Sequence, residues 1–229
     1  MPTTNQLTLE NICCVRGDNV LFSDLSISAE NGDLLRIRGE NGSGKTSLLR
    51  IISGIAYPDS GTVLWNKKTI KKSDSFANAI AYLAHRDGIK SELTTLENLR
   101  FYQQLYHQNN PDELLDILEA LDISHTAYLP TRQLSFGQRR RLGFARLLLS
   151  STELWLLDEP FTGIDVAGRK LLEQHCLNFI NHGGIVVMTH HAEIEHKELA
   201  KREKSIDLTA LNIAKINKEM SDKTKVESA

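Results

Sequence analysis

Apolar and polar residues alternate along the first part of the chain in the manner of short β-strands. The alternation covers Leu7 to Ile12, Val20 to Ser28 and Leu34 to Arg38, and turn-forming glycine and asparagine residues separate these runs. A helical pattern follows at Thr46 to Ser53, where leucines and isoleucines recur on one face. We therefore expect an N-terminal antiparallel β region and, beside it, a unit of a strand, a glycine-rich loop and a helix.

The period of the apolar positions changes between Thr94 and Gln133. There Leu96, Leu99 and Tyr102 recur every three residues, which is the spacing of one helix face. This segment, residues 94–133, is predicted to be a helical subdomain that continues into a further helix ending near residue 150. It interrupts a core that we assign to residues 1–93 and 134–206.

Two short apolar runs indicate the buried strands of that core. Leu154 to Leu157 and Ile185 to Met188 are unbroken, as strands covered on both faces usually are. The sequence therefore predicts an α/β fold with a mixed or parallel sheet, an antiparallel β region and an inserted helical subdomain. After Ile206 the periodicity fades, and we expect residues 207–229 to form a disordered tail.

The overall composition and charge give no indication of nucleic-acid binding or of a membrane span, and they do not determine the fold. The chain has 229 residues, enough for a sizeable core, and its formal net charge of −2 gives no sign of nucleic-acid binding. Neither a signal peptide nor an apolar run long enough to span a membrane is visible. We expect no nucleic-acid partner and no membrane span in this chain.

A glycine-rich loop with a lysine stands between the third predicted strand and the first predicted helix. It fits the pattern G-x-x-x-x-G-K-[ST] and consists of Gly39, Glu40, Asn41, Gly42, Ser43, Gly44, Lys45 and Thr46. Backbone N–H groups of such a loop surround phosphate oxygens at a helix N-terminus, Lys45 adds a positive charge, and Thr46 offers an oxygen to Mg²⁺. An incidental glycine turn is the minor alternative. The motif predicts ATP binding with Mg²⁺ as cofactor.

Two carboxylates end the strand that begins at Leu154. Asp158 is predicted to hold Mg²⁺, and Glu159 to orient and polarise the attacking water. An acidic turn after a strand would be the likelier interpretation without the phosphate loop upstream. Together with that loop, the pair indicates nucleotide hydrolysis at the carboxyl edge of the sheet.

The segment Ser135-Phe136-Gly137-Gln138 follows Leu134 and, with the two motifs above, resembles the signature sequence of ABC ATPases. Ser135 and Gln138 also match a capping box, so a well-capped helix is the plainer interpretation, and both can hold. The resemblance covers roughly the first 200 residues. It implies that Ser135 and Gly137 bind the γ-phosphate held by a second subunit, and hence a head-to-tail homodimer.

The same resemblance extends to two further residues. His190 falls where ABC ATPases place a switch histidine that contacts the γ-phosphate, although a lone histidine at a strand end is usually structural. Asp165 occupies the position of the aspartate that contacts the other subunit. The commoner serine-alanine-leucine before that aspartate is replaced by Thr162-Gly163-Ile164.

Two positions depart from the general ABC pattern. Where an aromatic side chain normally stacks on adenine, the aligned residue is Arg16, whose guanidinium can also stack on a base. Where a glutamine normally senses Mg²⁺ and the attacking water, the chain has His85.

Arg16 and above all the stretch from His85 to Leu99 resemble the haem exporter ATPase family of bacterial cytochrome c maturation. Phe136 departs from the small residue usual in that family's signature. The resemblance implies a peripheral subunit at the cytoplasmic face of the bacterial inner membrane, bound to integral membrane transporter subunits of the cytochrome c maturation complex. Its ATP hydrolysis would release a haem-loaded periplasmic chaperone.

Several alternatives remain at this level. The chain could be a subunit of another ABC importer or exporter, which would share the nucleotide site, or a soluble ABC protein without a membrane partner. A non-hydrolysing P-loop scaffold would be expected to lack one of the residues Lys45, Asp158, Glu159 or His190. The run Arg139-Arg140-Arg141 could bind phosphate or nucleic acid, but we interpret it as the solvated face of a helix.

Overall fold

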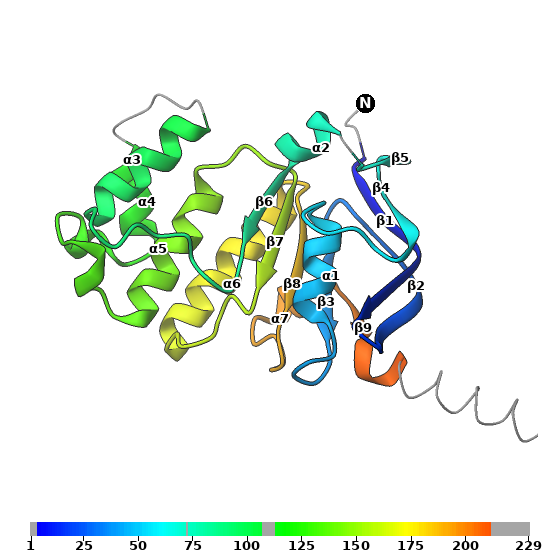
Figure 1. Ribbon diagram of the computed structural model, residues 1–229. Helices are drawn as coiled ribbons and strands as arrows, with labels where there is room; N and C mark the ends of the chain where they lie inside the picture. The colour runs from blue at the N-terminus through cyan, green and yellow to red at the C-terminus, as the bar shows by residue number, and fades with distance from the viewer. Residues whose placement is uncertain (1–3, 72, 107–112, 212–229) are drawn as a thin grey trace, which may run out of the picture.

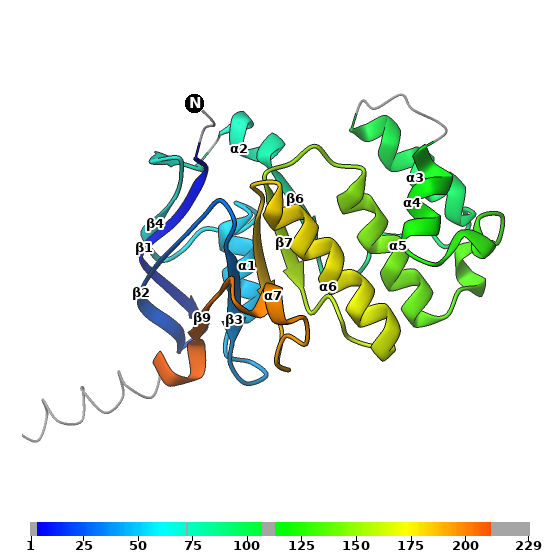
Figure 2. The same ribbon diagram turned by 180° about the vertical axis from the view of Figure 1, so that it is seen from behind.

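The computed structural model describes residues 4–71, 73–106 and 113–211. Within them the chain forms two sheets and a group of helices (Figure 1). The antiparallel sheet and the helices α3, α4 and α5 lie at opposite ends of the molecule, and the parallel sheet lies between them, as both views show (Figure 2). The predicted α/β class is confirmed.

The first sheet is antiparallel and has four strands in the order β2-β1-β4-β5. The strands are β1 (Gln6–Arg16), β2 (Asn19–Glu30), β4 (Ser60–Trp65) and β5 (Lys68–Thr69). Leu7 lies opposite Trp65 and Leu9 opposite Val63, so alternate side chains of β1 and β4 share one buried face. The strands predicted in this region are confirmed, and β1 and β2 are longer than the alternation indicated.

The second sheet is parallel and has five strands in the order β6-β7-β8-β3-β9. The strands are β6 (Ile80–Leu83), β7 (Leu154–Asp158), β8 (Ile185–Thr189), β3 (Leu34–Arg38) and β9 (Glu203–Asp207). All residues of β7 and β8 are buried, which agrees with their unbroken apolar runs. Because the strands are parallel, their carboxyl ends meet at one edge of the sheet.

The helices cover the parallel sheet and extend beyond it. They are α1 (Lys45–Ile52), α2 (Asp74–Ala79), α3 (Thr95–Leu105), α4 (Glu113–Ala120), α5 (Phe136–Leu148), α6 (Val166–Asn181) and α7 (Lys197–Ala200), with 3₁₀ turns at Ser124–Thr126 and Thr131–Gln133. One apolar core joins α1 to the facing sides of both sheets, and a second joins the parallel sheet to α3, α4, α5 and α6. The division of the chain at residues 93 and 133 stays a prediction.

Two expectations from the sequence are wrong. Asp207 ends β9, and the following residues 208–211 are helical with Leu208 fully buried, so the predicted disordered tail does not begin at residue 207. The rest of that predicted tail, residues 212–229, lies outside the described residues. In the arginine run, Arg140 is only 2% exposed and therefore does not belong to a solvated face.

Candidate nucleotide-binding and hydrolysis site

The glycine-rich loop connects β3 to α1, as its sequence context predicted. Gly44 caps α1 with φ +100, and a Cβ atom there would lie 2.9 Å from the ring of Phe22. Gly42 also has a positive φ, of 86°. A residue with a side chain at Gly44 would be strained and would clash, so glycine allows the loop to turn its N–H groups toward the start of α1.

Lys45 places its ammonium inside the loop. Its Nζ donates to the carbonyl oxygens of Gly39, at 2.8 Å, and of Glu40, at 3.0 Å. The N–H of Glu40 donates to the hydroxyl of Thr209 at 2.9 Å, so the C-terminal helical turn supports the loop from outside. The sequence analysis missed Thr209, because the periodicity of the chain fades before it.

The end of β7 brings Asp158 to the loop. Its carboxylate accepts hydrogen bonds from the hydroxyl of Thr46 at 2.9 Å and from that of Thr189 at 2.8 Å. Asp158 is paired with Thr189 in the β7–β8 register, which explains the second contact. Thr46 and Asp158 thus present hard oxygen donors side by side, the kind of ligand that Mg²⁺ prefers.

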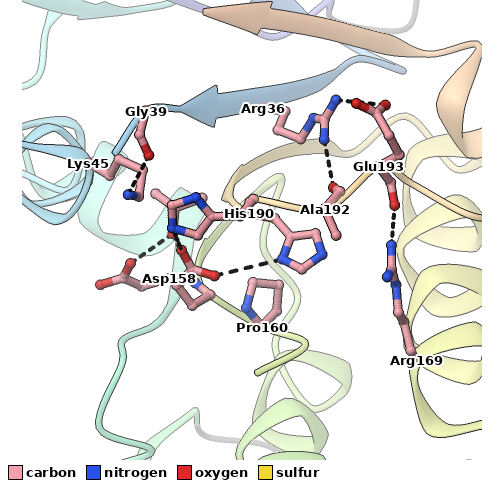
Figure 3. Close-up of polar contacts among 12 residues, drawn as sticks. Arg36, Gly39, Lys45, Asp158, Pro160, Arg169, His190, Ala192 and Glu193 are labelled. Carbon is pink, nitrogen blue, oxygen red and sulfur yellow. Dashed lines mark hydrogen bonds and ion pairs between the residues drawn. The ribbon is translucent and has the colours of Figure 1, made fainter. Parts of the chain in front are cut away.

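Glu159 follows Asp158 with an unusual backbone conformation. Its φ is +50°, and its N–H donates to the Thr189 hydroxyl at 2.9 Å, which holds the residue in this turn. Two imidazoles face its carboxylate: Nδ1 of His190 lies 3.7 Å away, an electrostatic contact too long for a hydrogen bond, and Nε2 of His191 lies 3.2 Å away. Figure 3 shows Lys45, Asp158 and His190 gathered here.

Opposing effects set the ionisation of Glu159. Burial raises the pKa of its carboxyl, but His190, His191 and the ammonium of Lys45 lower it, and the net pKa lies below the usual range. Glu159 is therefore a carboxylate at neutral pH. The sequence analysis named His190 but missed His191, since no motif marks the residue that follows His190.

A cleft of about 460 Å³ unites most of the predicted nucleotide residues. Its lining consists of Leu21, Asn41, Gly42, Gly44, Lys45, Thr46, Ser47, His85, Asp158 and Glu159. His85 is exposed and belongs to this lining, whereas Arg16 does not, and Leu21 is the lining residue from the antiparallel sheet. The adenine-stacking role of Arg16 stays a prediction.

Arg140 of α5 reaches under the turn formed by Asp158 and Glu159. Its guanidinium donates to the carbonyl oxygens of Asp158 and Glu159, and to that of Ala84 at 2.9 Å, and it forms an ion pair of 2.7 Å with Asp87. One buried cation thereby joins the helix that begins with the signature segment, the end of β7 and the loop that carries His85. The sequence analysis interpreted the arginine run as a solvated helix face, and that interpretation does not predict a buried contact for Arg140.

The signature segment lies at a second cleft. Ser135 and Gln138 form the reciprocal hydrogen bonds of a capping box at the start of α5, so the plainer interpretation of these residues is confirmed. The second cleft measures about 510 Å³ and is lined by Asp122, His125, Ser135, Phe136, Gly137, Gln138, Arg141, Gly163 and Asp165. The two clefts share no lining residue, and the signature segment does not line the cleft at the phosphate loop.

Asp165 stands at the rim of this second cleft and caps α6. Its carboxylate accepts from the N–H of Gly168 at 2.9 Å and pairs with Arg141 at 2.9 Å. The backbone N–H and then the guanidinium lower the pKa of the Asp165 carboxyl. Within one chain this aspartate therefore has a structural role, and its contact with a second subunit stays a prediction.

Comparison with known proteins assigns the chain to a family. A family model described as ABC transporter matches residues 22–162. The cytochrome c biogenesis ATP-binding export protein CcmA of Histophilus somni is 47% identical over 86% of this chain and 92% of its own length. The protein of the same name from Mannheimia succiniciproducens is 44% identical over 93% of this chain and 96% of its own length.

The chain belongs to the ABC transporter family. Within that family it groups with the CcmA proteins, and it is an ABC-type ATPase. A solved structure of a putative ABC transporter ATP-binding protein from Pyrococcus furiosus has the same fold, with a TM-score of 0.77 at 24% identity, and covers 90% of this chain and 98% of that one. No helix among the described residues is long and apolar enough to cross a membrane.

Proposed function

We propose that the cleft between the phosphate loop and the end of β7 binds and hydrolyses Mg·ATP. Lys45 and the N–H groups of the loop would bind the phosphates, and the neighbouring oxygens of Thr46 and Asp158 would hold Mg²⁺. Bound there, the ion would supply positive charge to the phosphate oxygens. The 2.9 Å contact between the two ligand side chains supports this assignment.

Glu159 would act on the attacking water. Its carboxylate is ionised, partly buried and lines the cleft, so it can accept a hydrogen bond from water and orient it toward the γ-phosphate. His190, facing the same carboxylate, would contact the γ-phosphate. His85 also lines the cleft and would make turnover depend on the partner-facing loop that follows it.

A homodimer would complete each site. Ser135 and Gly137 of one subunit would bind the γ-phosphate held by the other, with Phe136 and Gln138 shaping the signature turn and Asp165 at the contact. This arrangement is supported by the separation of the two clefts within one chain. Each chain would then offer both halves of a composite site to its partner.

The biological role that we propose is the ATPase of haem export in c-type cytochrome biogenesis. The observation that carries it is the likeness to CcmA proteins, which reaches 47% identity. The chain would bind integral membrane transporter subunits of the cytochrome c maturation complex. It would lie peripherally at the cytoplasmic face of the bacterial inner membrane.

The test is to block hydrolysis in cells and follow c-type cytochromes. Lys45→Ala should remove most Mg·ATP affinity, and Glu159→Gln should retain binding and stop turnover, because Glu159 acts on water. With either variant as the only copy, haem should reach the periplasmic chaperone and stay there, and mature c-type cytochromes should disappear from haem-stained gels. Total haem synthesis is the control. Normal c-type cytochromes with the variant protein present would contradict the role.

A further inference from the structure

The segment after the switch histidine, residues 191–196, is held by arginines from two separate elements. Arg36 of β3 is 1% exposed, and its Nη1 donates to the carbonyl oxygen of Ala192 at 2.7 Å. The same guanidinium pairs with Glu193 at 3.3 Å and with Glu203 of β9 at 2.7 Å. Figure 3 shows the contact of Arg36 with Ala192.

Arg169 of α6 holds the segment from its other side. Its Nη2 donates to the carbonyl oxygen of Glu193, as Figure 3 shows, and its Nη1 pairs with Glu195 at 3.1 Å. Its Nε donates to Glu173 at 3.0 Å, and Glu173, fully buried, accepts the N–H of His196 at 2.7 Å. An arginine and a buried glutamate on one turn of α6 thereby restrain the segment over several residues.

The contacts of Arg169 continue to the ring of His190. Within the described part of the chain, neither ring nitrogen of His190 has a hydrogen-bond partner. The ring instead packs edge-on against Phe161, with centroids 5.0 Å apart and an interplanar angle of 86°. The guanidinium of Arg169 lies 5.6 Å from the centroid of that Phe161 ring. The position of His190 therefore depends on packing and on the segment that follows it.

We propose that Arg169 and Arg36 are positioning residues for hydrolysis, which place His190 and His191 at the carboxylate of Glu159. A ring without hydrogen bonds in the chain can rotate unless its neighbours restrain it. Here the restraint comes from Phe161 and from a chain segment held by charge-assisted hydrogen bonds, whose geometry is specific. The inference rests on the catalytic role proposed for Glu159 and His190 and adds what holds them in place.

Arg169→Met is the informative change, because it keeps the apolar stem and removes the guanidinium. We expect kcat for ATP hydrolysis to fall by about tenfold to about a hundredfold, as for other small misplacements of catalytic groups. The KM for ATP should stay within about twofold, since the phosphate loop is left intact. Lys201→Met is the matched control: it removes an exposed cation whose ion-pair partner among the described residues is the exposed Glu198 side chain, and it should leave both constants unchanged.

A double-mutant cycle separates positioning from general loss of structure. If Arg169 acts through His190, Arg169→Met should change kcat by less than about twofold in a His190→Ala background. The same loss in both backgrounds, an unchanged kcat in the otherwise native chain, or a raised KM alone would overturn the inference. Phe161→Leu, which removes the ring edge at similar volume, should reproduce the kcat loss and replaces Arg169→Met if that variant does not fold.

The proposed hydrolysis can fail independently of this inference. The proposed function itself would be contradicted if the native chain had no ATPase activity, or if Glu159→Gln left that activity unchanged. Activity that is lost in Glu159→Gln but unaffected by Arg169→Met and Phe161→Leu would contradict only the positioning role.

Discussion

At the scale of single residues, one contact joins two positions at which the chain departs from the families that it resembles. Phe136 replaces a small residue in the signature segment, and Gly163 replaces an alanine in the loop before Asp165. A Cβ atom on Gly163 would lie 2.3 Å from Cδ1 of Phe136, so the ring occupies the space that an alanine would need. Gly163 also has φ +71°, which favours glycine. The large residue at one position therefore requires the small one at the other.

We expect Gly163→Ala to destabilise the protein by about 1 to about 3 kcal/mol, the usual cost of overpacking a filled site. In a Phe136→Ala background the loss should be smaller, because only the strain of the positive φ remains. Denaturant unfolding of the four proteins of this cycle gives the free energies of unfolding. An equal loss in both backgrounds would show that Phe136 and Gly163 are not coupled.

At the scale of elements, helix starts are fixed by short sequence patterns. Thr94 accepts the N–H of Glu97 at 3.2 Å, and the Glu97 carboxylate accepts the N–H of Thr94 at 2.8 Å, which forms a capping box at the start of α3. Ser135 and Gln138 repeat the arrangement at α5. Two hydrogen bonds from Thr94 lower the pKa of the Glu97 carboxyl: the larger effect comes from the Thr94 N–H and the smaller from its hydroxyl. The cap is therefore strongest while that carboxyl is ionised.

Thr94→Ala should lower the free energy of unfolding by about 1 kcal/mol, the typical cost of losing an N-cap side chain. Because the folded pKa of Glu97 is depressed, its contribution is present above the unfolded pKa and is lost as pH falls through the folded pKa. The stability difference between the native chain and Glu97→Gln should therefore be larger at pH 7 than below about pH 4. Urea unfolding at both pH values measures it, and a difference that grows on acidification would contradict the cap.

At the scale of the whole molecule, the site depends on the order of the parallel strands. The strand β3 lies between β8 and β9, so the phosphate loop at its end is next to Thr189 on one side and to the turn after Asp207 on the other. That turn brings Thr209 to the N–H of Glu40. The helical turn at residues 208–211 thus contacts the phosphate loop, although it lies far from the loop in the sequence.

Thr209→Val tests this link, because valine keeps the shape and removes the acceptor. Leaving the Glu40 N–H without its partner costs about 1 kcal/mol, so we expect about fivefold weaker Mg·ATP binding. Thr209→Ser retains the hydroxyl and should bind as the native chain does. Calorimetric titration with ATP distinguishes the variants. Identical ATP affinities of Thr209→Val and Thr209→Ser would show that the Thr209 hydroxyl does not contribute to nucleotide binding.

The sequence alone determined the fold class, the buried strands, the phosphate loop between β3 and α1, and the acidic pair at the end of β7. These features are local, because a strand, a capped helix or a glycine loop is encoded by residues close together in the chain.

Only the tertiary structure decided which distant residues meet. The arginine run shows the reason: helical spacing does not say which of its members is buried, since that depends on the surface packed against the helix. The structure places Arg140 beneath the carbonyl oxygens of Asp158 and Glu159. In the same way His191 reaches Glu159 through strand pairing, and Phe136 meets Gly163 through the packing of α5 beside the turn that follows β7. Such contacts join segments that no local pattern connects.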